Sequence, residues 1–199
     1  MNLRSSTTAV VLAGGMGRRM DGVDKGLVEV HGKPMIGYVI ETLAENVDNI
    51  VINANRNLEE YGRYPVTVVP DSLQGYQGPL AGVEAGLSAA QTDWVFTCPC
   101  DSPMQSTELL PHMWNEISAT DAEIGVAHDG SRTHPVFLIL RRELLESLRR
   151  YLGEGQRKID RWFDNHRLAT IDCSQFAQSF VNVNTEEELA RAAEQLAPQ

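Results

Sequence analysis

The sequence predicts an α/β fold of three layers, in which helices cover both faces of a mostly parallel, mixed sheet. Two observations predict this fold. Short apolar runs alternate along the chain with segments whose apolar residues recur at helical spacing, which is the order of strands joined by helical crossovers. Several of the short runs are apolar at nearly every position, as is typical of parallel strands buried on both faces. The 199 residues contain no internal repeat, linker or low-complexity tract, so we expect one domain, residues 1–199.

The strands are predicted from these apolar runs. The first six residues lead straight into the first strand, and a brief extended piece, Leu27–Val30, follows a long loop. Asp129-Gly130 is a turn signal between two neighbouring runs, which we expect to pair as an antiparallel hairpin and to make the sheet mixed. In chain order the predicted strands are Ala9–Leu12, Asn49–Asn53, Val66–Val69, Trp94–Cys98, Ile124–Ala127, Pro135–Leu140 and Leu168–Ile171.

The helices are predicted from apolar residues that recur every three or four positions. Gly32 turns the chain, and Pro34 is placed to begin the first long helix because its fixed φ suits a first helical turn. Thr185 and Glu188 form a capping-box pattern for the last helix, with Asn184 or Thr185 as the expected cap. The other predicted helices are Leu58–Tyr61, Pro79–Ala90, Ser106–Ile117, Arg142–Tyr151 and Ile159–Asn165, and the last is Glu186–Leu196.

The loop Leu12–Leu27 is the part of the chain best suited to a ligand. Its glycines let the backbone turn sharply and approach a ligand closely. Free N–H groups in such a loop form a concavity that binds anions, and basic side chains add full positive charges beside it. We therefore expect a polyphosphate to bind here. The residues concerned are Gly14, Gly15, Gly17, Arg18, Arg19 and Lys25.

Two common phosphate-binding loops are excluded. A P-loop requires Gly-Lys followed by Ser or Thr, whereas the order here is Asp24-Lys25-Gly26. A dinucleotide fingerprint requires a third glycine or an alanine where Met20 stands, and an acid at the end of the second strand, where Asn53 stands.

The same loop carries a resemblance to a known family. The order Leu-Ala-Gly-Gly-x-x-x-Arg-Met, followed by Asp-Lys-Gly, resembles the signature loop of nucleotidyltransferases that act on small phosphorylated acceptors, and it looks most like that of the molybdenum cofactor guanylyltransferases. The run Asn182–Thr185 also resembles the end of that family, and the resemblance covers almost the whole chain. It implies a Rossmann-like nucleotidyltransferase fold of the glycosyltransferase-A type. It also implies transfer of GMP from GTP to the terminal phosphate of molybdenum-molybdopterin, with Mg²⁺ as cofactor and pyrophosphate as the second product.

The candidate site residues come partly from the pattern and partly from the resemblance. Asp101 lies just beyond a predicted parallel strand, on the edge where open α/β sheets bind ligands, so it is the candidate Mg²⁺ ligand. Its alternative role is to cap the next helix. With Arg19 and Lys25, which screen phosphate charge, it forms the predicted catalytic set. The expected nucleotide contacts are Leu12, Ala13, Gly14, Gly15, Lys25, Asn53, Asp71 and Asp101, and the acceptor contacts that the resemblance implies are Arg19, Gly22, Gly78, Gly82, Arg157, Asn182 and Asn184.

Each end of a GTP molecule needs its own chemistry. We expect the backbone N–H groups of Ala13–Gly15 to face the phosphates. The guanine edge presents an N1–H and an exocyclic amine, so the carboxylate of Asp71, which follows a strand, is a suitable acceptor. Asn182 or Asn184 is expected to add a neutral oxygen at the metal or to hold a water. The acceptor phosphate is already a nucleophile at neutral pH, so no general base is expected.

Composition narrows the class of protein. The net charge of −10 disfavours a general nucleic-acid binder, so the basic loop and a divalent cation must reverse the field locally. No signal sequence or membrane-spanning run is present, and we expect a cytoplasmic protein. His128 and His134 lack a third metal ligand of fitting spacing, which favours turn or substrate-loop roles. Cys98, Cys100 and Cys173 follow no disulfide, redox or zinc pattern and are expected to be buried.

Several alternatives stay open at this point. Arg157, Lys158 and Arg161 form either a solvated basic face or a second anion site for the acceptor phosphate. The enzyme could be a cytidylyltransferase for the same pterin or a sugar-1-phosphate enzyme, although relatives that use CTP tend to read Ala-Ala-Gly at residues 13–15. A non-catalytic module that binds GTP and delivers the cofactor is the third alternative. The expected partners are GTP, molybdenum-molybdopterin and molybdoenzyme-specific chaperones, and the expected state is a monomer.

Overall fold

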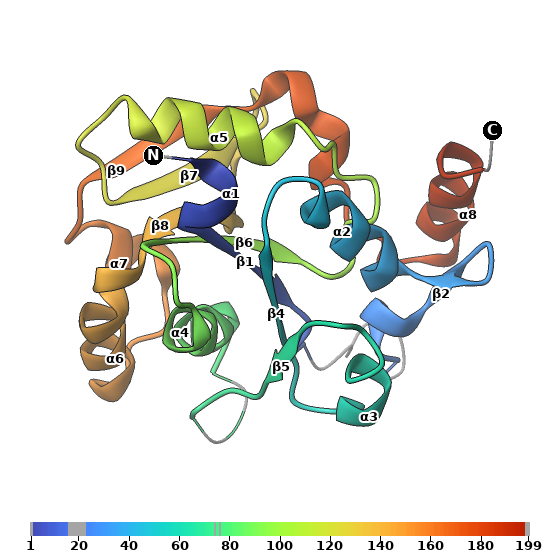
Figure 1. Ribbon diagram of the computed structural model, residues 1–199, viewed down its shortest axis with the longest axis horizontal. Coiled ribbons are helices and arrows are strands. Elements are labelled where there is room, and N and C mark those ends of the chain that lie inside the picture. The colour runs from blue at the N-terminus through green and yellow to red at the C-terminus, as the bar shows by residue number, and fades with distance from the viewer. Residues whose placement is uncertain (1, 16–22, 74, 76, 198–199) are drawn as a thin grey trace.

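The computed structural model describes residues 2–15, 23–73, 75 and 77–197, and its centre is a seven-stranded sheet (Figure 1). One strand, the fifth across the sheet, is antiparallel to both of its neighbours, and all other neighbouring strands are parallel. The predicted mixed, mostly parallel sheet is therefore confirmed. Across the sheet the strands are β5 (Thr67–Val69), β4 (Asn49–Asn53), β1 (Thr7–Leu12), β6 (Trp94–Pro99), β8 (Thr133–Arg141), β7 (Ile124–His128) and β9 (Leu168–Asp172).

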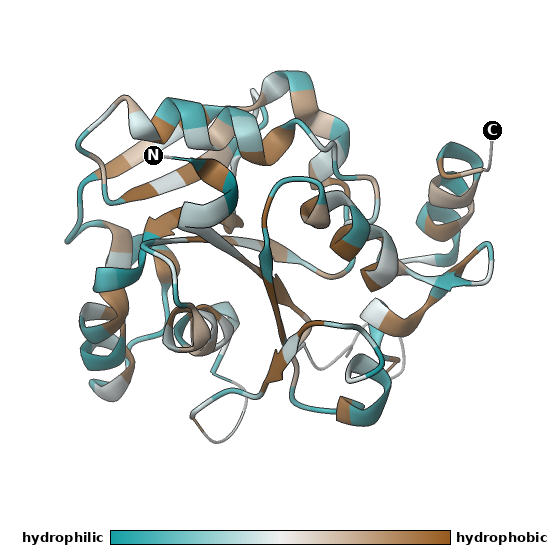
Figure 2. Ribbon diagram, in the orientation of Figure 1, coloured by the Kyte–Doolittle hydropathy of each residue, from teal (hydrophilic) through white to brown (hydrophobic). Residues whose placement is uncertain are grey.

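Helices cover both faces of this sheet, which confirms the three layers. Because side chains alternate along a strand, Val10 packs on one face and its neighbours Ala9 and Val11 pack on the other. The central strands are largely hydrophobic in Figure 2, as expected for a sheet buried between two layers. Helices α2 (Met35–Ala44) and α5 (Leu109–Ser118) pack on the face of Ala9, and α4 (Pro79–Ala89), α6 (Leu145–Gly153) and α7 (Ile159–Phe163) pack on the face of Val10.

Smaller elements complete the chain. The last helix, α8 (Glu186–Gln195), docks on a hairpin of β2 (Glu29–Val30) and β3 (Lys33–Pro34), where Val30 and Met35 pack with Val183 and Ala192. None of the helices in the described residues is long and apolar enough to cross a membrane. The remaining elements are α1 (Leu3–Ser6), α3 (Leu58–Tyr61) and three 3-10 helices, η2 (Lys25–Leu27), η3 (Arg142–Leu144) and η4 (Ser174–Phe180).

Three predicted helix starts need correction, and one α-helix was not predicted. α6 begins at Leu145 rather than at Arg142, because residues 142–144 form the 3-10 helix η3. Pro34 lies in β3, and its extended backbone places it one residue before α2 rather than in the first turn of that helix. α5 begins three residues later than predicted, because the carbonyl and hydroxyl oxygens of Ser106 accept hydrogen bonds from the N–H groups of the next residues in a separate turn. α1 was not predicted; it is only four residues long and is capped by the side chain of Asn2.

The strand order reverses between β1 and β6. From β1 the chain moves outward to β4 and β5, and α4 then carries it back to β6 on the other side of β1. At this reversal Leu12 is level with Asn53 on one side and with Pro99 on the other. The crevice beyond the carboxyl ends of strands at such a reversal is where open α/β sheets bind ligands.

Candidate active site

A pocket of about 640 Å³ opens at this reversal, beyond the carboxyl ends of β1, β4 and β6. It brings together most of the predicted site residues. Arg157 does not line it, and Arg19 and Gly22 lie outside the described residues. The predicted residues that line the pocket are Leu12, Ala13, Gly14, Gly15, Lys25, Asn53, Asp71, Gly78, Gly82, Asp101, Asn182 and Asn184.

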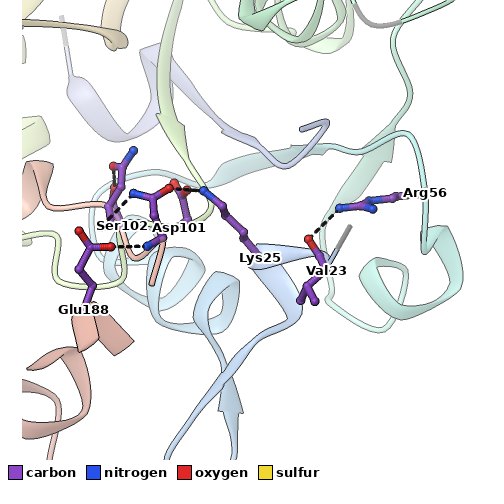
Figure 3. A network of polar contacts seen from close by, with 8 residues as sticks. Val23, Lys25, Arg56, Asp101, Ser102 and Glu188 are labelled. Atoms are coloured by element: carbon purple, nitrogen blue, oxygen red, sulfur yellow. Dashed lines mark hydrogen bonds and ion pairs between the residues drawn. The ribbon is translucent and has the colours of Figure 1, made fainter. Parts of the chain in front are cut away.

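Lys25 and Asp101 form a charged pair on one side of the pocket (Figure 3). The Lys25 Nζ donates to Asp101 Oδ2 over 3.0 Å and also to Asn184 Oδ1. The two charged side chains are only 19% and 11% exposed, so their charges are poorly screened by water. Among the described residues no group donates a hydrogen bond to Asp101 Oδ1, which leaves that oxygen for a ligand.

The start of α8 holds the two asparagines beside this pair. Thr185 is the cap, since its hydroxyl oxygen accepts from the N–H of Glu188 over 3.2 Å, which is one of the two hydrogen bonds of the predicted capping box; the second goes to Asn184 instead of Thr185. The Glu188 carboxylate reaches back and accepts from the N–H of Asn184 over 2.7 Å. Asn182 Oδ1 accepts from the Ser102 hydroxyl over 2.7 Å, and the N–H of Val183 donates to the carbonyl of Asp101 over 2.8 Å. The segment is therefore tied to the end of β6 at consecutive residues.

Lys25 is positioned by its two neighbours in sequence. The carboxylate of Asp24 accepts from the Tyr61 hydroxyl over 2.6 Å and from Asn57 Nδ2 over 2.8 Å, which fixes η2 against α3. Burial, with the nearby Cys100 and Asp24, raises the pKa of Tyr61 well above its usual range, so the hydroxyl remains a donor. A Cβ at Gly26 would lie 2.6 Å from the Tyr61 hydroxyl oxygen. In the triplet Asp24-Lys25-Gly26, Asp24 therefore anchors η2, Lys25 lines the pocket, and Gly26 allows Tyr61 to approach closely.

Asp71 and Asn53 lie together at another side of the pocket. Asn53 Nδ2 donates to Asp71 Oδ1 over 2.8 Å, and Asn55 Nδ2 donates to Asp71 Oδ2 over 2.9 Å. Asn53 is 2% exposed, whereas Asn55 is exposed. Asp71 follows β5 and Asn53 ends β4, so adjacent parallel strands supply these residues.

One expectation about the backbone of the first loop is wrong in part. The N–H of Ala13 donates to the carbonyl of Asn53 over 2.8 Å, as a continuation of the sheet, so it does not face a phosphate. Gly82, in α4, lines the pocket and also makes room for a protein group, because a Cβ there would lie 2.4 Å from Asn53 Oδ1. Gly78 has a φ of +80° with open space around it, and it borders the pocket freely.

Arg157 stands behind the pocket wall. Its Nε donates to Gln77 Oε1 over 2.5 Å, and its guanidinium also donates to the carbonyl of Leu152 over 2.8 Å. Gln77 lines the pocket, so Arg157 reaches the site through it. Gln77 and Asp24 were not predicted from sequence to be site residues, although Asp24 belongs to the motif Asp24-Lys25-Gly26 that carries the family resemblance. Other lining residues that were not predicted are Pro79, Pro99, Cys100 and Val136.

His134 and the three cysteines make contacts that suit structural roles. His134 does not line the pocket: it is 2.7 Å from Asp129 Oδ2 and stacks on Phe180 with 4.4 Å between ring centroids. The three cysteines are free and buried, as expected, and burial raises the pKa of Cys98 and Cys173 to about 12. Their thiols therefore stay protonated at neutral pH. Among the described residues no group of three or more His, Cys, Asp or Glu side chains is arranged to hold a metal.

Comparison with known proteins gives a consistent result along the sequence. Residues 9–171 match the family model described as a MobA-like NTP transferase domain. The chain is 44% identical over 188 residues to the molybdenum cofactor guanylyltransferase of Shewanella sp. (strain MR-4), an alignment that covers 94% of this chain and 95% of that protein. It is 43% identical over 189 residues to the protein of the same name from Shewanella loihica, with 95% and 96% of the two chains covered.

Solved structures show the same fold. The molybdopterin-guanine dinucleotide biosynthesis protein A of Archaeoglobus fulgidus superposes with a TM-score of 0.79 at 24% identity, covering 95% of this chain and 97% of that one. The 4-diphosphocytidyl-2C-methyl-D-erythritol synthase of Anaerococcus prevotii superposes with a TM-score of 0.73 at 16% identity, covering 96% and 98%. The sheet and its flanking helices are thus shared with proteins of quite different sequence.

Proposed function

Because the chain belongs to the MobA-like NTP transferase family, we propose that this enzyme transfers GMP from GTP to the terminal phosphate of molybdenum-molybdopterin, with release of pyrophosphate. The observation that carries the proposal is the pocket itself. One side presents a carboxylate held by neutral amides, which suits a purine edge, and another presents the Lys25–Asp101 pair, which suits phosphates and a divalent cation. Relatives more than 40% identical along nearly the whole chain carry the name molybdenum cofactor guanylyltransferase.

The nucleotide lies across the end of β1 in this proposal. Asp71 accepts hydrogen bonds from the guanine edge. The N–H groups of Gly14 and Gly15 make no backbone hydrogen bond within the described residues, so they are free to donate to phosphate oxygens. Lys25 adds a full positive charge at the triphosphate. Gly78 and the asparagines Asn182 and Asn184 border the remaining volume, which takes the phosphorylated pterin.

The residues of the pocket fit Mg²⁺. This ion takes one or two carboxylates and completes an octahedron with substrate phosphates and water. Asp101 offers one carboxylate oxygen that has no hydrogen-bond partner in the described chain. The amide oxygen of Asn184 lies close to the carboxylate, because both accept hydrogen bonds from the ammonium of Lys25. When bound, Mg²⁺ withdraws electron density from the α-phosphate and neutralises charge on the departing pyrophosphate.

The chemistry needs only one displacement. An oxygen of the acceptor phosphate attacks the α-phosphorus of GTP, the bond from that phosphorus to the bridging oxygen breaks, and pyrophosphate leaves. Cys100 lines the pocket, but burial raises the pKa of its thiol well above the usual range, so it is not a nucleophile. Lys25 stabilises the phosphate charge as it shifts toward the leaving group. Positioning and charge stabilisation therefore carry the reaction.

Three finer statements belong to this proposal. Molybdoenzyme-specific chaperones are expected to receive the product, and the enzyme is expected to act as a monomer. A cytoplasmic location is supported by the substrate, since GTP is made there. Transfer of CMP, use of a sugar-1-phosphate, or delivery without catalysis remain the competing functions, and the names of the relatives do not favour them.

The proposal is tested by pyrophosphate release. The enzyme is incubated with Mg²⁺ and molybdenum-loaded pterin, and GTP, CTP, ATP and UTP are compared. We expect release with GTP alone. Release with CTP alone would make the enzyme a cytidylyltransferase, and binding of GTP without release would make it a delivery module.

Asp101→Asn supplies the matched variant for the metal. It keeps the size of the side chain but removes its charge, so we expect a loss of pyrophosphate release of about a hundredfold or more. Circular dichroism and thermal unfolding should be close to those of the wild type, since Asp101 follows the strand β6 rather than forming part of the core. Full activity in a folded Asp101→Asn enzyme would remove the metal assignment.

A further inference from the structure

Asn55 lies beside the pocket without lining it, and no role was predicted for it from the sequence. We propose that Asn55 is a positioning residue that fixes the Asp71 carboxylate for reading the guanine edge, and that it thereby sets the preference for guanine over hypoxanthine. This inference rests on the proposed function, because it deepens the part played there by Asp71.

The contacts of Asn55 converge on Asp71. Asn55 Nδ2 donates to Asp71 Oδ2 over 2.9 Å, and Asn55 Oδ1 accepts from the N–H of Asp71 over 2.8 Å. One amide thus holds both the side chain and the backbone of the same residue. The other carboxylate oxygen, Oδ1, accepts from Asn53 Nδ2 over 2.8 Å. The carboxylate of Asp71 is therefore held between two amides.

The backbone explains why the two asparagines act together. β4 ends at Asn53 and Asn55 lies in the bend that follows, and both side chains reach Asp71 beyond the end of β5. Ala54 lies between them, and its N–H donates to the carbonyl of Val69 over 3.0 Å, which continues the pairing of β4 with β5.

Gly14 makes room for the side chains of Asn53 and Asn55. A Cβ at Gly14 would lie 2.8 Å from Asn55 Nδ2 and 3.1 Å from Asn53 Oδ1. Asn55 Nδ2 is also 3.5 Å from the carbonyl oxygen of Gly14, at the far limit of a hydrogen bond. Asn55 consequently spans the gap between the first loop, which takes phosphates in the proposed function, and the residue that takes the base.

The chemistry of a carboxylate held in this way suits guanine. Each carboxylate oxygen can accept two hydrogen bonds, so one amide donor on each oxygen leaves a second acceptor direction on both. Guanine offers two adjacent donors, the N1–H and the 2-amino group, whereas hypoxanthine offers only the N1–H. In the described part of the chain no cation pairs with Asp71, so its negative charge stays available to strengthen both hydrogen bonds.

Asn55 can be changed without opening the core. Asn53 is 2% exposed and is packed against the backbone of Gly82, so its removal would disturb the fold as well as Asp71. Asn55 is exposed, and its side-chain hydrogen bonds go to Asp71 and Gly14. A substitution there isolates the orientation of the carboxylate.

The test compares GTP with inosine triphosphate, which lacks the 2-amino group. In Asn55→Ala we expect the ratio of kcat/KM for GTP to that for inosine triphosphate to fall about tenfold, mainly through a higher KM for GTP, because the charged hydrogen-bond acceptor is no longer fixed. Asn55→Asp should lower GTP binding further, since it places a second carboxylate against Asp71. Asn165→Ala removes another exposed asparagine and should leave the ratio unchanged.

A merely structural role would lower both rates equally and leave their ratio unchanged. Asp71→Asn separates the possible failures. If Asp71→Asn lowers the ratio and Asn55→Ala does not, the inference is overturned while the proposed function stands. If neither lowers it, Asp71 does not read the base and the inference falls with that assignment. If the wild type releases no pyrophosphate, equilibrium binding of the two nucleotides supplies the same ratio and tests Asn55 separately from catalysis.

Discussion

At the scale of single residues, Lys25 holds one oxygen of the carboxylate that the divalent cation would also need. The ammonium lies 3.0 Å from the carboxylate and is shared with Asn184 Oδ1. Two cations on one carboxylate repel each other, and the repulsion is larger where water is largely excluded. Metal binding at Asp101 must therefore compete with Lys25 until the triphosphate offers the ammonium another partner.

This competition predicts two opposite effects of Lys25→Met. Binding of GTP should weaken about tenfold or more, because one charged contact to phosphate is lost. Binding of Mn²⁺ without nucleotide should tighten, because the competing ammonium is gone. Electron paramagnetic resonance of free Mn²⁺ measures the second effect. Lys33→Met removes the same charge from a residue paired with Glu41, outside the pocket, and should change neither. Unchanged Mn²⁺ binding in Lys25→Met would show that Lys25 does not compete with a cation for Asp101.

The residues of the site could be predicted from sequence where strand ends carry unusual side chains. Asp71 and Asp101 were found because each follows an apolar run, and Lys25 because it lies in a glycine-rich basic loop. The meaning of a glycine could not be predicted in the same way. Gly82 was expected to face the acceptor and it does line the pocket, but it also makes room for Asn53, and that second role depends on a neighbour that is distant in sequence.

At the scale of elements, the 3-10 helix η2 presents Lys25 because both of its flanks are fixed. Asp24 is 8% exposed and is held by Tyr61 and Asn57 from α3, and Gly26 packs against the same tyrosine and against Cys100. A short helix of three residues has little stability of its own, so these contacts determine its position.

Gly26→Ala tests this dependence. The added methyl would lie 2.6 Å from the Tyr61 hydroxyl oxygen, and we expect a loss of stability of about 1–3 kcal/mol together with reduced turnover. Adding Tyr61→Phe removes the clashing oxygen, so the double variant should regain part of the stability but not the anchoring of Asp24. Chemical denaturation measures the stability of the two single variants and of the double variant. Additive losses would contradict the proposed contact.

Most strands and helices could be predicted from sequence, and the ones that were missed are short. The predicted strands fall within two residues of their predicted ends because their apolar runs are bounded by polar or turn-forming residues, whereas the two-residue β3 was not predicted. β4 and α3 match the predicted ranges at both ends. α1 and the α2 start depended on a local cap and on the extended backbone of Pro34, which propensity alone does not reveal.

At the scale of the whole molecule, the pocket joins parts of the chain that are far apart in sequence. Lys25 and Asn184 are 159 positions apart, and Lys25 and Asp101 are 76 apart. The pocket takes residues from the ends of β1, β4 and β6 and from the segment before α8, so the site depends on the assembled sheet rather than on one local motif. A partly unfolded chain would not form this site.

Nucleotide binding should therefore stabilise the entire fold. A ligand that binds only the folded state at a hundred times its dissociation constant adds about 2.7 kcal/mol. For a domain of this size we expect Tm to rise by about 5–10 °C with Mg²⁺ and GTP. Thermal unfolding measures the rise, and CTP at the same concentration is the control. An unchanged Tm at a GTP concentration that saturates binding would mean that the site forms without the global fold.

The large sequence separation between the residues that line the pocket also affects the lifetime of the protein in a cell. Proteases cut chains that have opened, and the open population falls as bound nucleotide stabilises the closed one. Because residues from β1 to the segment before α8 line one pocket, occupancy at the pocket protects the whole chain from degradation. A fall in the supply of GTP would then shorten the lifetime of the enzyme as well as slow its reaction.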